Sequence, residues 1–113
     1  MNTRSIGTHY EEIVCKYLIS YGVQILEKNY TCKFGEVDII GFKDNTLIFF
    51  EVKYRKDEQF GNALCAIGKS KQKRIINCAK YYTAFKEYDC FIRFDAIGIT
   101  NGKIEWIKDA FWM

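Results

Sequence analysis

The chain has 113 residues, 49% of them hydrophobic and 17% aromatic, and its formal net charge is +3. This composition excludes a disordered chain, and no apolar run approaches the roughly 20 residues that a membrane span needs. The mild positive charge permits an anionic partner without demanding one. The length, and the absence of proline, repeats and low-complexity segments, predict one domain over residues 1–113 with no membrane partner.

The cysteines and the single histidine limit the chemistry of the chain. The five cysteines form no C-x-x-C pair, which favours reduced thiols used as small core residues. Residues 1–8 contain no apolar stretch of the signal-peptide type, so we expect a cytoplasmic protein. With His9 as the only histidine, zinc would have poor ligands. The cysteines are Cys15, Cys32, Cys65, Cys78 and Cys90.

Residues 4–20 are predicted to form an amphipathic helix. Apolar side chains recur there at the i, i+3, i+4 spacing of a helix, and Gly22 marks its end. Glu11 falls at the border of the apolar stripe. It either faces the surface that the helix covers or is an ordinary border carboxylate. The stripe consists of Ile6, Tyr10, Ile13, Val14, Tyr17, Leu18 and Tyr21.

A strand and a β-hairpin are predicted to follow this helix. Residues 23–33 have a mixed alternation that is typical of a strand. Residues 36–42 and 46–54 are rich in Val, Ile and Phe, and the polar residues 43–45 separate them. This pattern predicts two antiparallel strands joined by a turn.

The hairpin carries charged side chains inside apolar strands. Because side chains alternate across a strand, Glu51 and Lys53 share one face of the second strand. Asp38 shares a face of the first strand with Glu36. Charged groups are costly to bury unless they are paired or hold a metal. Glu51 and Lys53 are therefore either a solvated salt bridge or part of a functional site, and the neighbouring Asp38 favours the site.

A second helix is predicted over residues 69–86, after residues 55–68. That preceding segment has no sustained period, and its length suggests a functional loop over the site. The helix has an apolar stripe, with Lys71 at its edge. The stripe consists of Ile75, Ile76, Ala79 and Tyr82.

The first turns of this helix are strongly basic. A helix N-terminus with its dipole and several lysines is a natural dock for phosphate, and the alternative is a solvated basic face. We predict that Lys69, Lys71 and Lys73 contact phosphates of a nucleic acid. Arg55 and Lys56 are further candidates for this surface.

The C-terminal part predicts two more strands. Residues 91–100 and 103–107 flank an Asn-Gly hairpin turn, and the apolar residues 109–113 are expected to dock on the body. Arg93 and Asp95 share a strand face, where they either pair with each other or brace the site. The order of elements predicts an α/β domain with a mixed central sheet flanked by two helices.

Two carboxylates on adjacent strands predict a site for a hard cation. Mg²⁺ (or Mn²⁺) prefers oxygen ligands, which Asp38, Glu51 and the backbone carbonyl of Val52 could supply. The ion would polarise a phosphodiester and lower the pKa of a bound water. Lys53 could orient that water or stabilise developing charge. Glu11 could hold a second ion or a water bound to it.

The same residues resemble a nuclease signature. Asp38, the run Glu51-Val52-Lys53 and an upstream helical glutamate are similar to the PD-(D/E)xK nuclease superfamily. Nearly end to end, the chain resembles the YraN family of small bacterial proteins, related in fold to archaeal Holliday-junction resolvases. The resemblance implies a restriction-endonuclease-like fold, with Asp38, Glu51 and Lys53 as the catalytic triad and Glu11 as helper. It is carried by Glu11, Tyr17-Leu18, residues 35–40, 50–55 and 60–61, Lys71, residues 93–95 and residues 106–111.

We therefore expect a magnesium-dependent endonuclease that acts on DNA, with branched or single-stranded structures as candidate substrates. A two-fold homodimer would suit a two-stranded or branched substrate. One alternative is a catalytically inactive nucleic-acid-binding module with the same fold, which would bind equally with and without magnesium. Another is a structural or assembly protein in which the acids and the lysine form buried ion pairs.

Overall fold

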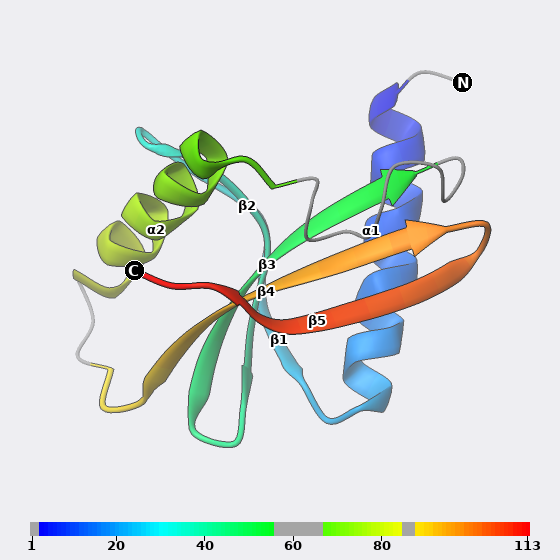
Figure 1. Ribbon diagram of the computed structural model, residues 1–113. Coiled ribbons are helices and arrows are strands. Elements are labelled where there is room, and N and C mark those ends of the chain that lie inside the picture. The colour runs from blue at the N-terminus through cyan, green and yellow to red at the C-terminus, as the bar shows by residue number, and fades with distance from the viewer. Residues whose placement is uncertain (1–2, 56–66, 85–87) are drawn as a thin grey trace.

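Two helices and five strands make up the described part of the chain (Figure 1). The computed structural model describes residues 3–55, 67–84 and 88–113, of which residues 3–8 and 55 are described by their backbone alone. Most of the segment predicted as a functional loop, residues 56–66, lies outside the described residues. The elements are α1 (Thr3–Ser20), β1 (Gln24–Cys32), β2 (Gly35–Lys43), β3 (Thr46–Arg55), α2 (Lys69–Ala84), β4 (Phe91–Thr100) and β5 (Lys103–Phe111).

The strands form one mixed sheet in the order β1-β2-β3-β4-β5. β1 pairs with β2, β2 with β3, and β4 with β5 in antiparallel fashion. β3 and β4 run parallel, so the chain must cross from one end of the sheet to the other between them, and α2 lies in that connection. The predicted α/β domain with a mixed sheet is confirmed.

Both predicted hairpin turns are present, and their backbone explains their residue types. Asp44 and Asn45 have φ of 51° and 54°, and Asn101 and Gly102 have φ of 51° and 77°. Two consecutive residues with positive φ are typical of the type I′ turn, whose twist matches that of the flanking strands. Lys43, which was predicted to lie in the first turn, ends β2 instead.

α1 covers one face of the sheet (Figure 1). The helix ends as predicted: Gly22 has φ of 91°, and the Val23 amide donates to the Leu18 carbonyl at 3.0 Å. Two members of the predicted apolar stripe are wrong, because Ile13 and Tyr21 are 37% and 55% exposed. The helix touches the sheet through a narrower stripe. The buried cluster on this face is Val14, Cys15, Leu18, Val23, Ile39, Ile48, Phe50, Ile97 and Ile99.

α2 covers the opposite face (Figure 1). Ile75 and Ala79 are buried as predicted, Cys78 joins them, and Ile76 and Tyr82 are half-buried. The buried cluster on this face is Val37, Ile40, Leu47, Phe49, Ile67, Ile75, Cys78, Ala79, Phe94, Ala96 and Phe111. Neither described helix has the length and apolar content that a membrane crossing requires.

The C-terminal strand is longer than predicted. β5 continues to Phe111, which pairs with Phe94 across a register shift and stacks on its ring at 5.1 Å. Residues 109–111 thus extend the ladder rather than form a separate tail. The expected docking of the final residues is wrong for Trp112 and Met113, which are 73% and 65% exposed. Asp109 has φ of 57°, and neither Asp nor Ala favours a strand, which is why the pattern underestimates β5.

Candidate functional site

Asp38 and Glu51 lie where β2 and β3 separate. The paired register of these strands runs from Lys43 and Thr46 to Ile39 and Phe50, and the two acids are the next residues. The Oδ2 atom of Asp38 accepts a hydrogen bond of 2.8 Å from the Val52 amide. The Asp38 side chain therefore takes the place of a ladder partner. It holds the two carboxylates near each other at the point where the sheet opens.

The two oxygens of Glu51 have different surroundings. Glu51 is only 2% exposed. Its Oε1 atom lies 2.9 Å from Nζ of Lys71 and 3.5 Å from Nζ of Lys53. Its Oε2 atom is buried and has no hydrogen-bond partner within the described part of the chain. Buried polar atoms are rarely left unpaired, so this oxygen requires an explanation.

The charge state of Asp38 reflects the same crowding. Burial, and after it the negative charge of Glu51, raises the pKa of Asp38 to about 7. The hydrogen bond from Val52 and the charge of Lys71 act in the opposite direction. Near neutral pH this carboxyl therefore exchanges its proton readily. A cation bound beside it would favour the ionised form.

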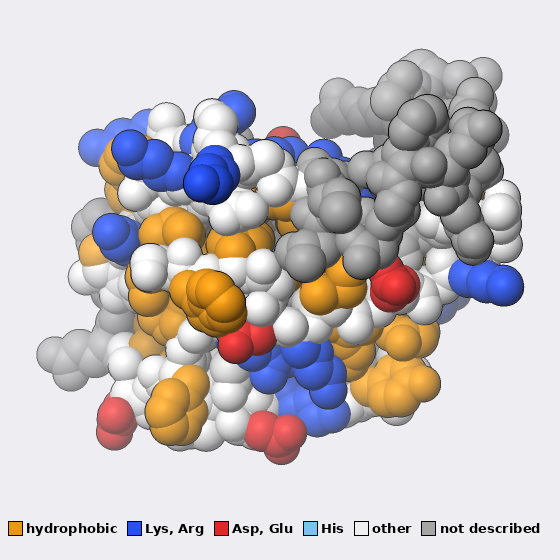
Figure 2. Space-filling model, viewed as in Figure 1, with side chains coloured by type: hydrophobic (Ala, Val, Ile, Leu, Met, Phe, Trp, Pro, Cys, Tyr) orange, Lys and Arg blue, Asp and Glu red, His pale blue; other side chains and the backbone are white. Residues whose placement is uncertain are grey.

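Lys71 belongs to this site, although the sequence analysis assigned it to a phosphate-binding surface. Burial disfavours the charge of Lys71, but the ion pair with Glu51 outweighs that effect and raises its pKa. Its position at the edge of the α2 apolar stripe was the signal that it faces inward. Lys69 and Lys73, on the same helix, are exposed. Figure 2 shows Lys and Arg side chains gathered over α2, at the upper left of the view.

Glu11, on α1, lies close enough to the site for its charge to act on Asp38. Its Oε2 atom accepts a hydrogen bond of 2.8 Å from the Asn29 side chain. Its charge contributes the smallest of the effects that raise the pKa of Asp38. Asn29 was missed by the sequence analysis. Asn29 has a φ of 53° although it lies in the middle of β1. The register between β1 and β2 also shifts a few residues earlier, between Ile25 and Glu27. A polar residue within a strand was the available signal.

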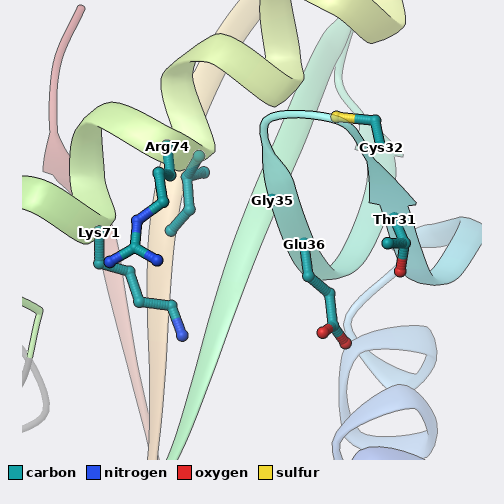
Figure 3. A pocket seen from close by; sticks show the side chains of 7 residues that line it. Thr31, Cys32, Gly35, Glu36, Lys71 and Arg74 are labelled. Carbon is teal, nitrogen blue, oxygen red and sulfur yellow. The ribbon is translucent and has the colours of Figure 1, made fainter.

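A pocket of about 350 Å³ opens next to Lys71, between α2 and the end of the β1–β2 hairpin. Figure 3 shows Lys71 and Arg74 of α2 on one side and Thr31, Cys32 and Glu36 on the other. Glu36, predicted as a supporting residue, is exposed and lines this pocket. One wall of the pocket therefore carries a negative charge from Glu36, and the opposite wall carries positive charges from Lys71 and Arg74.

Arg93 and Asp95 pair with each other on the other face of the sheet. The Arg93 guanidinium donates to both carboxylate oxygens, at 2.8 and 2.9 Å. Asp95 also accepts from the Trp106 indole and from the Asp109 amide, at 2.8 and 2.9 Å. Asp95 is adjacent in register to Phe50, which packs against α1, so this network does not contact Glu51. The Arg93–Asp95 pair is one of the two arrangements that strand alternation predicts, whereas the contacts from Trp106 and Asp109 come from another strand and leave no signal in the local pattern.

The other predicted site residues have no described side-chain geometry. Arg55 ends β3, but its side chain, like all of Lys56, lies outside the described residues. The carbonyl of Val52 stays a predicted ligand. Within residues 3–55, 67–84 and 88–113, no group of three or more His, Cys, Asp or Glu side chains is arranged to hold a metal. Any ion would therefore depend on the two carboxylates with backbone or solvent oxygens.

Fold and site together define a single α/β domain with a five-stranded mixed sheet and a carboxylate pair at the opening between β2 and β3. The chain belongs to the uncharacterised protein family UPF0102, whose model matches residues 10–99. A UPF0102 protein of Fusobacterium nucleatum is 43% identical and covers 99% of this chain and 95% of its own length. One from Clostridium perfringens is 44% identical (96% and 94%), and one from Psychromonas ingrahamii is 41% identical (96% and 91%).

Proposed function

We propose that this protein is a metal-dependent nuclease that hydrolyses phosphodiester bonds in DNA. One observation carries the proposal. Asp38 and Glu51 lie at the opening of two strands, and one buried oxygen of Glu51 has no hydrogen-bond partner among the residues that the structure describes. The charge of Glu51 disfavours the ionised form of Asp38, and a divalent cation between the two carboxylates would remove that cost. Perturbed acids in an opening of the fold are candidates for function.

The residues at the opening fit Mg²⁺ or Mn²⁺. These ions take oxygen ligands and keep several waters, so two carboxylates can suffice. Asp38, the free oxygen of Glu51 and the Val52 carbonyl would hold the ion. When bound, it would supply positive charge to the phosphodiester and a water of lowered pKa. Because the lysines contact the other oxygen of Glu51, the free oxygen is available without breaking their ion pairs.

The two lysines supply the remaining charge. Lys53 is 30% exposed and Lys71 is 41% exposed, so both ammonium groups can reach a phosphate from their places beside Glu51. In this proposal Lys53 donates to the charge that develops on the phosphate, and Lys71 binds a non-bridging oxygen. Glu11 and Asn29 hold the flank of the site, and Glu11 is the candidate for a second ion.

The resemblance to nucleases supports the same conclusion. Asp38 and the Glu51-Val52-Lys53 run match the acidic and lysine positions of the PD-(D/E)xK pattern, with Val37 in place of its proline. The resemblance to the YraN family implies a restriction-endonuclease-like fold. The substrate part of the proposal rests on this resemblance and on the exposed basic face of α2, formed by Lys69, Lys73 and Arg74. Branched or single-stranded DNA is the proposed substrate, since the related fold is that of junction resolvases.

A cleavage panel tests the proposal. Single-stranded, duplex, flap and four-way DNA are incubated with the protein and Mg²⁺ or Mn²⁺, and products are resolved on denaturing gels. We expect cleavage of at least one substrate, and a loss of activity by at least roughly 10²–10³-fold in Glu51→Gln and in Asp38→Asn. Both variants should stay folded, because each removes one of two repelling charges.

A matched control is Glu105→Gln, which removes an exposed strand carboxylate on β5. It should cleave as the wild type does. A protein that binds DNA equally with and without the metal and never cuts would be a nucleic-acid-binding module. If the protein does not bind DNA and Glu51→Gln is unfolded, the ion pairs of Glu51 have a structural role. Near-normal turnover in Glu51→Gln would contradict the site assignment.

A further inference from the structure

Two cysteines from distant parts of the chain meet beside the pocket. The Cys32 thiol, at the end of β1, donates to the Cys78 sulfur on α2 at 3.3 Å. The β1–β2 hairpin packs tightly against α2 here. A Cβ atom placed on Gly35 would lie 3.5 Å from Cβ of Arg74 and 3.9 Å from Sγ of Cys78. The sulfur atoms therefore need to approach by little more than 1 Å to reach the bonded distance of about 2.05 Å.

The two thiols differ in access. Cys32 is half-buried and lines the pocket, whereas Cys78 is 0% exposed. Burial, and after it the hydrogen bond from Cys32, raises the pKa of Cys78 to about 12. Cys78 is therefore protonated at neutral pH and shielded from reagents. A small molecule in the pocket meets the sulfur of Cys32 first.

We propose that Cys32 and Cys78 are a redox modification site, at which a low-molecular-weight disulfide converts the dithiol to an intramolecular disulfide. The pocket has the volume of small-ligand sites. Lys71 and Arg74 on one wall and Glu36 on the other offer partners for both the carboxylates and the ammonium groups of an oxidant such as glutathione disulfide. This inference is independent of the proposed nuclease activity.

The chemistry balances in two exchange steps. The Cys32 thiol loses its proton, and its sulfur attacks one sulfur of glutathione disulfide, which releases one glutathione thiolate. Cys78 then loses its proton and attacks the Cys32 sulfur of the mixed disulfide, and the second glutathione leaves. The two cysteines are oxidised by two electrons, and one glutathione disulfide is reduced to two glutathiones, which take up the two protons. Contact with Cys32 makes the second step intramolecular, which offsets the weak acidity of Cys78.

The cross-link would tie α2 to the β1–β2 hairpin. Cys78 lies two turns along the helix from Lys71, on the same side, so the bond would fix the wall of the pocket that carries Lys71. It would also close a long loop of the unfolded chain, which stabilises the folded state. We expect the oxidised protein to melt about 5 °C or more above the reduced protein.

Peptide mapping tests the proposal on the full chain. Reduced protein is incubated with glutathione disulfide at mildly alkaline pH, blocked with a maleimide and digested with trypsin without reduction. Cleavage after Lys28, Lys33, Arg74 and Lys80 releases residues 29–33 and 75–80, each with one cysteine. We expect these two peptides as one cross-linked species, two hydrogens lighter than their sum, and its loss on reduction.

Variants separate the two roles. Cys78→Ala should retain one glutathione on Cys32, and Cys32→Ser should leave the buried Cys78 unmodified and abolish the rise in melting temperature. Cys90→Ser, which removes another half-buried cysteine, is the matched control and should give the wild-type cross-link. Free Cys32 and Cys78 after oxidation, a lasting glutathione on wild-type Cys32, or a cross-link to any other cysteine would overturn the proposal.

Discussion

Two buried carboxylates on opposite faces of the sheet have contrasting environments. Asp95, 0% exposed, accepts four hydrogen bonds, from Arg93, Trp106 and the Asp109 amide. Glu51, 2% exposed, has one oxygen beside ammonium groups and one without a described partner. A buried acid whose oxygens are all satisfied stabilises the fold. A buried acid with a free oxygen, next to a second acid, is where a cation would gain most.

The largest expected effect is the loss of stability when Asp95 is removed. Asp95→Ala leaves the Arg93 guanidinium, the Trp106 indole and a backbone amide without their acceptor. Breaking one partner of a buried ion pair costs about 3–5 kcal/mol, so the free energy of unfolding in urea should fall by about that amount. Trp106→Phe, which removes a single donor to a charged group, should cost about 1.5–3 kcal/mol.

Glu51→Ala is the comparison for Asp95→Ala. It should lower the free energy of unfolding much less, because the lost ion pair with Lys71 is offset by relief of repulsion with Asp38. Equal losses in the two variants would mean that both carboxylates are structural. Asp95 and Glu51 would then have the same role, and the proposed difference between the two faces of the sheet would be wrong.

The effect of Lys53 variants on turnover tests whether the ion pair around Glu51, unlike that of Asp95, takes part in catalysis. If its ammonium group stabilises developing charge on the phosphate, Lys53→Ala should lower kcat by roughly 10²–10³-fold at saturating Mg²⁺ and DNA, with little loss of affinity. Lys53→Arg should be intermediate, because a planar guanidinium places its donors differently. If Lys53→Ala turns over as fast as the wild type, Lys53 has no catalytic role and its pair with Glu51 is a structural salt bridge.

The raised pKa of Asp38 predicts a pH dependence of stability. The folded protein binds this proton more tightly than the unfolded chain, because the pKa rises from 3.8 to about 7. The contribution of Asp38 to the free energy of unfolding should therefore fall as the pH rises across that window, and stay level below and above it. Allowing for partial exposure, we expect a fall on the order of 2 kcal/mol.

Urea unfolding at several pH values measures this component, which should be absent in Asp38→Asn. Above pH 7, added Mg²⁺ should restore stability to the wild type and not to Asp38→Asn, because the ion binds the ionised carboxylate. A Mg²⁺ effect of the same size in both proteins would place the ion elsewhere.

The smallest expected effect concerns the exposed lysines of α2. Each phosphate contact that is lost flattens the dependence of log affinity on log salt by about one unit. The double variant Lys69→Ala, Lys73→Ala should therefore flatten the slope by about two, and further substitution of Lys71 by about one more. Lys80→Ala, an exposed lysine near the other end of α2, is the control. An unchanged slope in the triple variant would move the nucleic-acid surface to Arg55 and Lys56.

Much of the fold is readable from the chain because its signals are local. The period of the apolar residues defines α1 and the central hairpin, and Asp-Asn and Asn-Gly form the two turns. Strand alternation places Phe49 and Phe50 on opposite faces. The same alternation identifies Asp38, Glu51 and Lys53, since charges inside apolar strands stand out without knowledge of their neighbours.

Tertiary structure alone decides which distant residues meet. The chain shows that Lys71 lies at the edge of a helical stripe, but only the packing of α2 on the sheet brings its ammonium group to Glu51. The bonds from Trp106 to Asp95 and the contact of Cys32 with Cys78 likewise join separate elements. The length of β5 depends on the ladder with β4. Such pairings follow from the register and depth of whole elements, which no local pattern of residues encodes.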